Sequence, residues 1–178
     1  SGNKQIMSSD FEILLVEDTL TQAMLYQHQL ELNGFKARIA RSAQQALEIL
    51  AKEKPILVLS DINMPEISGL ELCRRLKDNV NTQGLLFVLL GTALKPAEIV
   101  EIINSGADDF LLKNIDQGFL FDKLRRLIEA QPSPGDLDQP LVTRAINIDG
   151  KSYTLSFKPS QAAGLLLTLY EMLCISKG

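Results

Sequence analysis

The sequence predicts an α/β protein in which a doubly wound parallel sheet is followed by a β-hairpin and a final helix. Five short apolar runs alternate with five helical stretches, a pattern that indicates a parallel sheet covered on both faces. The first, third and fourth runs are almost wholly apolar and should be central, whereas the second carries Lys36 and Arg38 at alternate positions, as edge strands do. With right-handed crossovers, these features favour the flavodoxin-like strand order 2-1-3-4-5.

Residues with strong start or stop preferences bound each element. Thr19, Ser42, Ser68 and Asp116 are expected helix N-caps, and Ser42 and Ser68 each have Gln or Glu three residues later, as in a capping box. Pro96 opens the fourth helix, and Gly34 and Gly106 follow helix ends. We therefore expect strands over residues 11–16, 35–40, 55–60, 84–91 and 108–113, and helices over residues 20–33, 43–53, 69–78, 96–105 and 117–130.

Composition indicates an ordinary globular protein. The 178 residues are 46% hydrophobic and 22% charged, enough for one well-buried domain with an appendage. The net charge of −4 gives no basic surface, so no nucleic-acid partner is expected. The two cysteines, Cys73 and Cys174, lie far apart in expected helices, which favours reduced thiols and a cytoplasmic protein. No signal peptide and no membrane span are expected.

Charged residues follow three of the expected strands. Glu17 and Asp18 follow the first strand, Asp61 follows the third, and Lys113 ends the fifth. Because ligands of doubly wound folds bind beyond the carboxyl ends of the strands, these side chains should converge. Three carboxylates in one crevice repel one another, and a hard cation such as Mg²⁺ relieves that repulsion. With Lys113, the group forms a site for attack of an aspartate on phosphorus.

Three segments that carry these residues are "VED" at 16–18, "SDINMP..SG" at 60–69 and "GADDFLLK" at 106–113. In these motifs and their spacing, residues 11–130 resemble the receiver domain of two-component response regulators. The resemblance implies that Asp61 is the phosphoacceptor, supplied by a histidine kinase or a phosphotransfer protein. It also implies that the domain catalyses its own phosphorylation and dephosphorylation.

The same resemblance implies a role for each neighbouring residue. Asp18, Asp61 and the backbone carbonyl of Asn63 would bind Mg²⁺ directly, and Glu17 would act through metal-bound water. Lys113 would neutralise the phosphoryl oxygens. Phe110 stands at the aromatic switch position, three residues before the lysine.

Two positions depart from the family pattern. Ungapped counting places Gly91 where receivers carry a Thr or Ser hydroxyl at the end of the fourth strand, with Thr92 beside it. A missing hydroxyl puts the coupling to Phe110 in doubt. The family's Lys-Pro pair is Lys113-Asn114 here, and a cis bond before Asn costs about 3–4 kcal/mol, so a trans bond and a displaced lysine are expected.

Other interpretations remain open at this stage. Taken singly, Asp61 could belong to an ordinary turn, Glu17 and Asp18 to a helix start, and Phe110 to the core, while His28 has no second metal ligand at a suitable spacing. One rival is a degenerate receiver that binds partners independently of phosphorylation, motivated by Gly91. Another is a phosphohydrolase of the haloacid dehalogenase type, which is disfavoured because Thr19-Leu20 follows Asp18 where that family needs a second aspartate.

The last 48 residues differ in character. Residues 131–140 form a Pro/Gly/Asp linker, and residues 141–178 predict a hairpin turning at Asp149-Gly150 and an apolar helix capped by Ser160. We expect a homodimer through a seam of Leu166, Leu169 and Leu173, with Leu165 and Met172 beside it and Leu167 against the hairpin. The alternative is that the helix packs back on its own hairpin and receiver. This segment resembles connectors to kinase or cyclase modules, so we expect an output domain beyond it.

Overall fold

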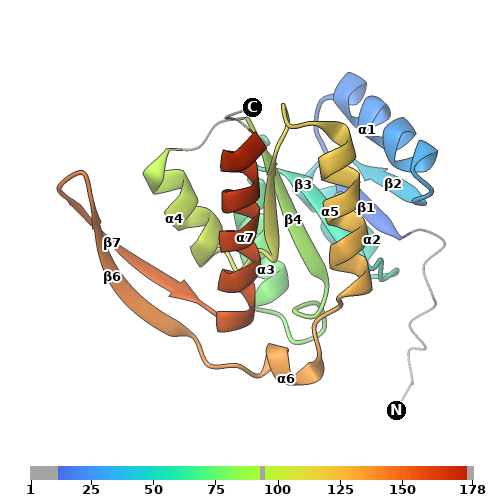
Figure 1. The fold of residues 1–178 in the computed structure, drawn as a ribbon. Coiled ribbons are helices and arrows are strands. Elements are labelled where there is room, and N and C mark those ends of the chain that lie inside the picture. The colour runs from blue at the N-terminus through green and yellow to red at the C-terminus, as the bar shows by residue number, and fades with distance from the viewer. Residues whose placement is uncertain (1–11, 93–94, 176–178) are drawn as a thin grey trace, which may run out of the picture.

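A five-stranded parallel sheet forms the centre of the computed structural model, which describes residues 12–92 and 95–175 (Figure 1). The strand order is β2-β1-β3-β4-β5, which confirms the predicted topology. Phe11, the expected first residue of β1, lies outside the described residues. The strands are β1 (Ile13–Val16), β2 (Ala37–Ala40), β3 (Leu57–Asp61), β4 (Leu86–Gly91) and β5 (Asp109–Leu112).

Helices cover both faces of this sheet. They are α1 (Leu20–Leu32), α2 (Ala43–Leu50), α3 (Gly69–Lys77), α4 (Pro96–Asn104) and α5 (Gln117–Glu129). Alternate strand residues face two separate cores: Leu14 and Val58 pack with α2, α3 and α4, whereas Ile13 and Leu57 pack with α1 and α5. This two-sided burial explains why the central strands are continuously apolar. None of the helices formed by residues 12–92 and 95–175 combines the length and hydropathy that a membrane span requires.

Most of the predicted caps form. The Ser42 hydroxyl accepts a hydrogen bond from the Gln45 backbone N–H, and the Ser68 hydroxyl accepts one from Glu71. Asp116 accepts from the backbone N–H of Phe119 at the start of α5. Thr19 is the N-cap residue of α1, as predicted, but its hydroxyl makes no capping hydrogen bond, and its backbone N–H donates to the Glu17 carboxylate at 3.1 Å. The acidic residue that follows β1 thus takes part in the turn into α1.

The C-terminal arm (residues 142–175) forms the predicted hairpin and helix. Strands β6 (Val142–Ile148) and β7 (Lys151–Phe157) pair antiparallel in the expected register, and Asp149 and Gly150 both have positive φ at the turn. Helix α7 (Pro159–Ile175) begins one residue before Ser160, so the prediction that Ser160 caps it is wrong. The expected linker contains a one-turn helix, α6 (Pro134–Leu137).

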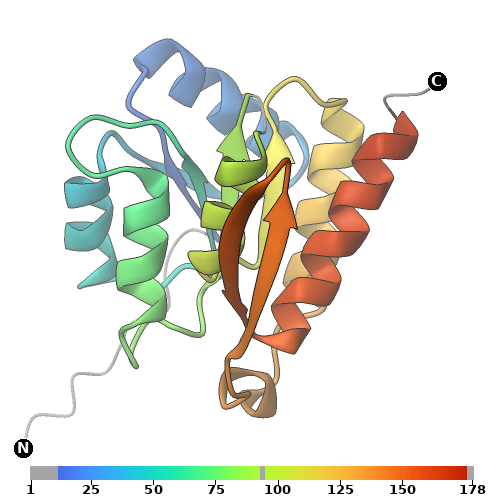
Figure 2. The same ribbon diagram turned by 90° about the vertical axis from the view of Figure 1, so that its left-hand side faces the viewer.

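The C-terminal arm packs against the receiver region. Strand β7 lies on α4, and α7 runs along β5 between α4 and α5, as Figures 1 and 2 show. The side-chain amide of Asn104, the last residue of α4, joins the hairpin through two hydrogen bonds. Its Nδ2 donates to the Thr154 carbonyl at 2.9 Å, and its Oδ1 accepts from the Ser156 N–H at 2.8 Å. The arm therefore covers the edge of the sheet that β5 would otherwise expose.

Helix α7 buries a different face from the one that the sequence predicted for a dimer seam. Leu165 and Met172 are 6% and 8% exposed and belong to the receiver core, so their expected place beside the seam is wrong. Leu167 is 52% exposed and does not cover the hairpin. Leu166 and Tyr170 also face outward, at 70% and 65% exposure, and the Leu173 side chain lies outside the described part.

A buried aspartate lies under α7. Asp109 is fully buried at the start of β5, and burial raises its pKa to about 6 although the Phe110 backbone N–H donates to it at 2.8 Å. The Nζ of Lys123, on α5, lies 3.9 Å from Asp109 Oδ2 and 3.2 Å from Glu171 Oε2. An ionised carboxylate in this position destabilises the folded protein.

We expect Asp109→Asn to stabilise the protein at neutral pH. The folded state raises the pKa of Asp109 above its unfolded value, so the folded state binds more protons and wild-type stability falls as pH rises from about 4 to about 6. The free energy of unfolding of the variant should exceed that of the wild type by about 1–3 kcal/mol at pH 7 and by little at pH 4. Urea unfolding across this range measures the difference, with exposed Asp122→Asn as the control; a gap that does not change with pH contradicts the prediction.

Candidate functional site

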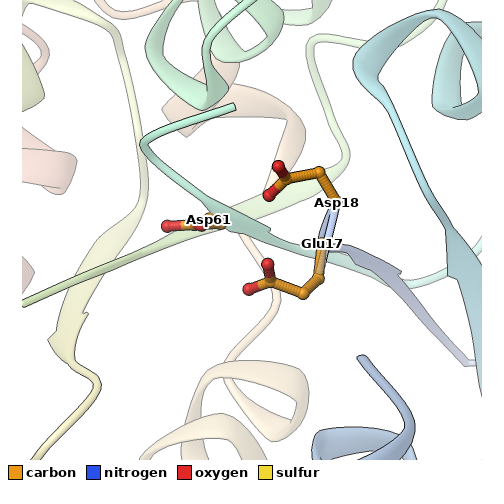
Figure 3. Close-up of side chains that lie close together, drawn as sticks. All are labelled: Glu17, Asp18 and Asp61. Atoms are coloured by element: carbon orange, nitrogen blue, oxygen red, sulfur yellow. The ribbon is translucent and has the colours of Figure 1, made fainter. Parts of the chain in front are cut away.

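Three carboxylates meet at the carboxyl ends of β1 and β3. Glu17 and Asp18 follow β1, and Asp61 is the last residue of β3, which pairs directly with β1. One oxygen from each carboxylate lies within 4.8 Å of the others, and Figure 3 shows Glu17 and Asp18 pointing to the side where Asp61 lies. Glu17 and Asp61 are buried, so their charges are only weakly screened by water.

Lys113 reaches this cluster from the end of β5. Its Nζ lies 3.0 Å from Glu17 Oε2 and 3.1 Å from Asp61 Oδ2. The prediction of a displaced lysine is therefore wrong. No cis peptide bond occurs among the described residues, which agrees with a trans Lys113–Asn114 bond. Burial lowers the pKa of Lys113, but its bonds to Glu17 and Asp61 outweigh burial and raise that pKa above its ordinary value. The pKa of Glu17 is also raised above its ordinary value, because the effect of burial exceeds that of the hydrogen bond from Lys113, which lowers this pKa.

The loop after β3 passes very close to Asp61. A Cβ atom on Gly69 would lie 2.0 Å from the Asp61 carbonyl oxygen, so only glycine fits at the start of α3. The Gly69 N–H donates to the Ile62 carbonyl at 2.9 Å, and the Asn63 N–H lies 3.4 Å from Asp61 Oδ1. The turn segment that the sequence singled out therefore positions the Asp61 carboxylate at the mouth of the site.

Gly91 ends β4, as ungapped counting predicted, and the ring of Phe110 lies beside it. A Cβ atom on Gly91 would approach Ile62 Cδ1 to 3.1 Å and Phe110 Cε2 to 3.3 Å. The Phe110 side chain is 2% exposed, whereas Thr92 is exposed and makes no hydrogen bond within the described part of the chain. The space next to Gly91 is thus bounded by the side chains of Ile62 and Phe110.

Sequence reasoning missed two residues that shape the site. Gln22, one helical turn after Asp18, accepts a hydrogen bond from Lys113 Nζ at 3.0 Å. With the contacts to Glu17 and Asp61, this bond gives each of the three N–H donors of the ammonium group a partner. Arg41 donates to the Asp18 carbonyl oxygen from Nη2 at 2.6 Å and from Nε at 3.2 Å. In the sequence, Gln22 could be linked to the site only by its position four residues after Asp18, which is about one helical turn. His28 is exposed.

The cluster has the donors that a hard divalent cation requires. Mg²⁺ binds through one or two carboxylates and retains several waters, and three carboxylate oxygens lie together here. Asp18 is less buried than Glu17 and Asp61, so the group opens to solvent on the Asp18 side. The residues present therefore fit Mg²⁺, with Asp18 and Asp61 as candidate ligands.

Comparison with known proteins identifies the class to which this fold and this acidic site belong. The family model of the response regulator receiver domain matches residues 13–125. The chain belongs to this family.

Individual relatives agree with that assignment. Response regulator PleD of Caulobacter vibrioides is 32% identical over 115 residues, which cover 65% of this chain and 25% of PleD. The phosphate regulon transcriptional regulatory protein PhoB of Pseudomonas aeruginosa is 28% identical over 151 residues, 84% of this chain and 66% of PhoB. The receiver domain of a signal transduction histidine kinase from Syntrophus aciditrophicus is 33% identical, with a TM-score of 0.64 over 70% of this chain and 96% of that one. The chain therefore spans a quarter of PleD and about two thirds of PhoB.

We expect Gln22→Leu to loosen Lys113 without unfolding the protein. Leucine has a similar volume but accepts no hydrogen bond, so one of the three Lys113 N–H groups loses its partner. The Nζ protons of Lys113 should exchange with water faster in the variant, while the free energy of unfolding changes by less than about 1 kcal/mol. NMR of ¹⁵N-labelled lysine measures the exchange, and Gln29→Leu on the same helix is the control. Equal exchange in both variants would show that Gln22 does not hold the lysine.

Proposed function

We propose that the protein is a phosphoacceptor receiver of a two-component phosphorelay, in which Asp61 takes a phosphoryl group from a histidine kinase or a phosphotransfer protein. The observation that carries this proposal is the contact of Lys113 with Asp61 at 3.1 Å beside the cluster of Glu17, Asp18 and Asp61. A carboxylate held between a cation and a metal-type cluster is poised for attack on phosphorus. Family membership supports the same chemistry.

Each residue has a defined part in the proposed transfer. An oxygen of Asp61 attacks the phosphorus of a phosphohistidine, the new O–P bond forms as the N–P bond breaks, and the imidazole leaves. Lys113 exchanges one of its present hydrogen bonds for a phosphoryl oxygen, and the bond to the exposed, uncharged Gln22 is the least costly to release. Asp18 and Asp61 would hold Mg²⁺, which supplies positive charge for the phosphoryl oxygens when bound; Glu17 and the Asn63 carbonyl complete the predicted set.

Phosphorylation-independent binding is the alternative within the same family. Gly91 motivates this alternative, because it provides no hydroxyl for a phosphoryl group. The third carboxylate, Asp18, favours the phosphoacceptor, since it completes with Glu17 and Asp61 a cluster that has the donors for the Mg²⁺ used in phosphoryl transfer. A cytoplasmic location stays a prediction in either case.

PhoB supplies a second candidate for the output of the protein. The PhoB alignment covers 151 residues of this chain, whereas the family match ends at residue 125, so that alignment includes part of the C-terminal region. This extent favours an output of the transcriptional-regulator type over the kinase or cyclase module predicted from the sequence. The expectation of no nucleic-acid partner was drawn from net charge alone and stays untested.

The homodimer also stays a prediction, with a different set of contact residues. The outward face of α7 carries apolar side chains at helical spacing: Ala163, Leu166, Leu167 and Tyr170. This face, rather than one that includes Leu165 and Met172, is the surface that a second copy would cover.

We expect acetyl phosphate with Mg²⁺ to add one phosphoryl group to the protein, and Asp61→Asn to abolish the addition. The asparagine amide is a poor nucleophile of nearly the same size, so the fold should persist. Intact-protein mass spectrometry measures the addition, chelation of Mg²⁺ should prevent it, and Asp78→Asn at an exposed position is the control. Phosphorylation that persists in Asp61→Asn would falsify the assignment.

We expect Phe110 to move little when beryllofluoride, a phosphoryl mimic, binds to the wild type, because Gly91 offers no hydroxyl to draw the ring or the loop inward. Gly91→Thr should displace the ring, since the added Cβ lies 3.3 Å from Phe110, and should cost about 1–3 kcal/mol of stability. NMR of labelled phenylalanine with and without beryllofluoride tests both statements. Gly84→Ala is the control, because its Cβ meets only Leu137 at 3.5 Å. A large wild-type rearrangement would indicate that Thr92 supplies the hydroxyl.

A further inference from the structure

A cavity of about 320 Å³ lies between the receiver and the segments that follow it in the chain. One wall comes from the ends of α3 and α4 and from Asp108, and the other comes from Pro132, α6, Leu141 and the junction of β7 with α7. Asp108 immediately precedes β5, so the cavity lies at the amino ends of the parallel strands, at the opposite edge of the sheet from Asp61. Helix α6 and the start of α7 lie at the same end of the molecule in Figures 1 and 2. The cavity is therefore separate from the carboxylate cluster.

Two of the carboxylates that line this cavity are engaged by donors of the chain itself. Asp108 accepts a hydrogen bond from Lys77 Nζ at 2.6 Å and another from the Phe87 N–H at 2.8 Å. Lys77 in turn gives its other donors to two backbone carbonyls. Asp136 accepts from the backbone N–H of Ser133 at 2.9 Å and from its hydroxyl at 2.8 Å, which lowers the pKa of Asp136. These charges are therefore already matched within the protein.

Two other cations of the lining have donors to offer to a ligand. The Arg74 side chain, half-buried on α3, makes no hydrogen bond or ion pair among the residues that the structure describes. Lys158 lies between β7 and α7 and donates to the Leu137 carbonyl, which leaves two of its three ammonium donors without a partner in the same part of the chain. A guanidinium group binds phosphate oxygens through paired N–H groups, and an ammonium group binds them as a point charge. The uncommitted charge of the cavity is thus positive on two walls.

The rest of the lining sets the size and character of the ligand. Gln83, Ser160 and Gln161 supply neutral amide and hydroxyl groups, and the exposed Asp78 supplies a further acceptor. None of the described residues that line the cavity is aromatic, so a nucleobase would have no ring on which to stack. The volume is at the lower end of the roughly 300–1,000 Å³ of ligand pockets. A compact molecule with one phosphate and several hydroxyl groups matches this lining better than a nucleotide.

We propose that this cavity binds a small sugar or polyol phosphate. The phosphate group contacts Arg74 from the receiver and Lys158 from the C-terminal arm, and the hydroxyl groups face the neutral side chains of the lining. Because the two cations belong to different parts of the chain, the ligand joins the receiver to the arm. The site makes no use of Asp61 and does not rest on the phosphoacceptor function.

NMR titration of the full chain with α-glycerophosphate, in the absence of Mg²⁺, tests the site. We expect saturable shifts of the backbone amides around residues 104–108 and 156–161, with a Kd in roughly the 1 μM–1 mM range common for enzymes and their substrates. The amides of Glu17 and Asp18 should not shift. The absence of saturable binding, or shifts confined to Glu17 and Asp18, would overturn the proposal.

Matched variants locate the phosphate group. Arg74→Gln should weaken α-glycerophosphate binding about tenfold or more, because charge-assisted hydrogen bonds are lost. Arg75→Gln removes the same charge from the next residue of α3, but Arg75 is exposed, pairs with Glu71 at 2.9 Å and does not line the cavity, so binding should be unchanged. Lys158→Gln repeats the test from the arm, with the exposed Lys151→Gln as its control, and keeps the test decisive if Arg74→Gln disturbs α3. Equal affinity in the wild type and all four variants would show that the probe binds elsewhere.

Three competitors decide the chemical class. Glycerol lacks the phosphate and should not displace α-glycerophosphate, and inorganic phosphate lacks the hydroxyl groups and should displace it weakly. Succinate offers carboxylates in place of phosphate and should be no better than inorganic phosphate. If glycerol competes as well as α-glycerophosphate, recognition of an anion is wrong. If succinate competes better than inorganic phosphate, the assignment to phosphate esters is wrong.

Hydrogen exchange tests whether the ligand joins the two walls. With α-glycerophosphate at about ten times its Kd, amide exchange that requires the walls to separate should slow by about tenfold, because the ligand binds only where both walls are present. This slowing is expected at residues 156–162 and not in β1. Saturated binding that leaves exchange at residues 156–162 unchanged would contradict the joining of receiver and arm.

Discussion

The ammonium group of Lys113 is the contact on which the arrangement of the site depends. Glu17 and Asp61 are buried at adjacent strand ends, and two buried carboxylates without a nearby cation would repel one another and lose much of their hydration. Lys113 follows β5, a strand two places away from β3 in the sheet, so the charge balance depends on the pairing of β1, β3, β4 and β5. Lys113 therefore serves the stability of the site and, in the proposed function, is also the cation that a phosphoryl group would contact.

Glycine positions determine what surrounds that contact. Gly69 allows the start of α3 to approach the Asp61 carbonyl more closely than any side chain permits, which fixes the loop that follows Asp61. Gly91 leaves a space bounded by Ile62 and the Phe110 ring, where the family pattern has a hydroxyl. The first glycine therefore sets the close approach of the α3 start to Asp61, and the second leaves Ile62 and Phe110 beside a position without a side chain.

An edge strand needs cover, and this need links the receiver to its arm. Strand β5 lies at the edge of the sheet and carries the buried Asp109, Phe110 and the approach to Lys113. Helix α7 covers this edge with apolar side chains, and the hairpin is tied to α4 through Asn104. A two-stranded hairpin is marginal alone, so the arm depends on the surface that it covers. The strand that leads to Lys113 is thereby also the strand that the arm contacts.

Local signals in the sequence were enough for the sheet order, the hairpin register and the convergence of Glu17, Asp18, Asp61 and Lys113, because alternation of apolar runs, turn residues and strand ends are properties of neighbouring residues. The sequence did not indicate Gln22 and Arg41 as partners of the site, since their contacts join helix and loop surfaces that meet only in the folded chain. It also could not decide which face of an almost uniformly apolar α7 is buried. Tertiary structure decided that point: the free edge of β5 selected the face with Leu165 and Met172, because only docking against a particular surface distinguishes one apolar face of a helix from another.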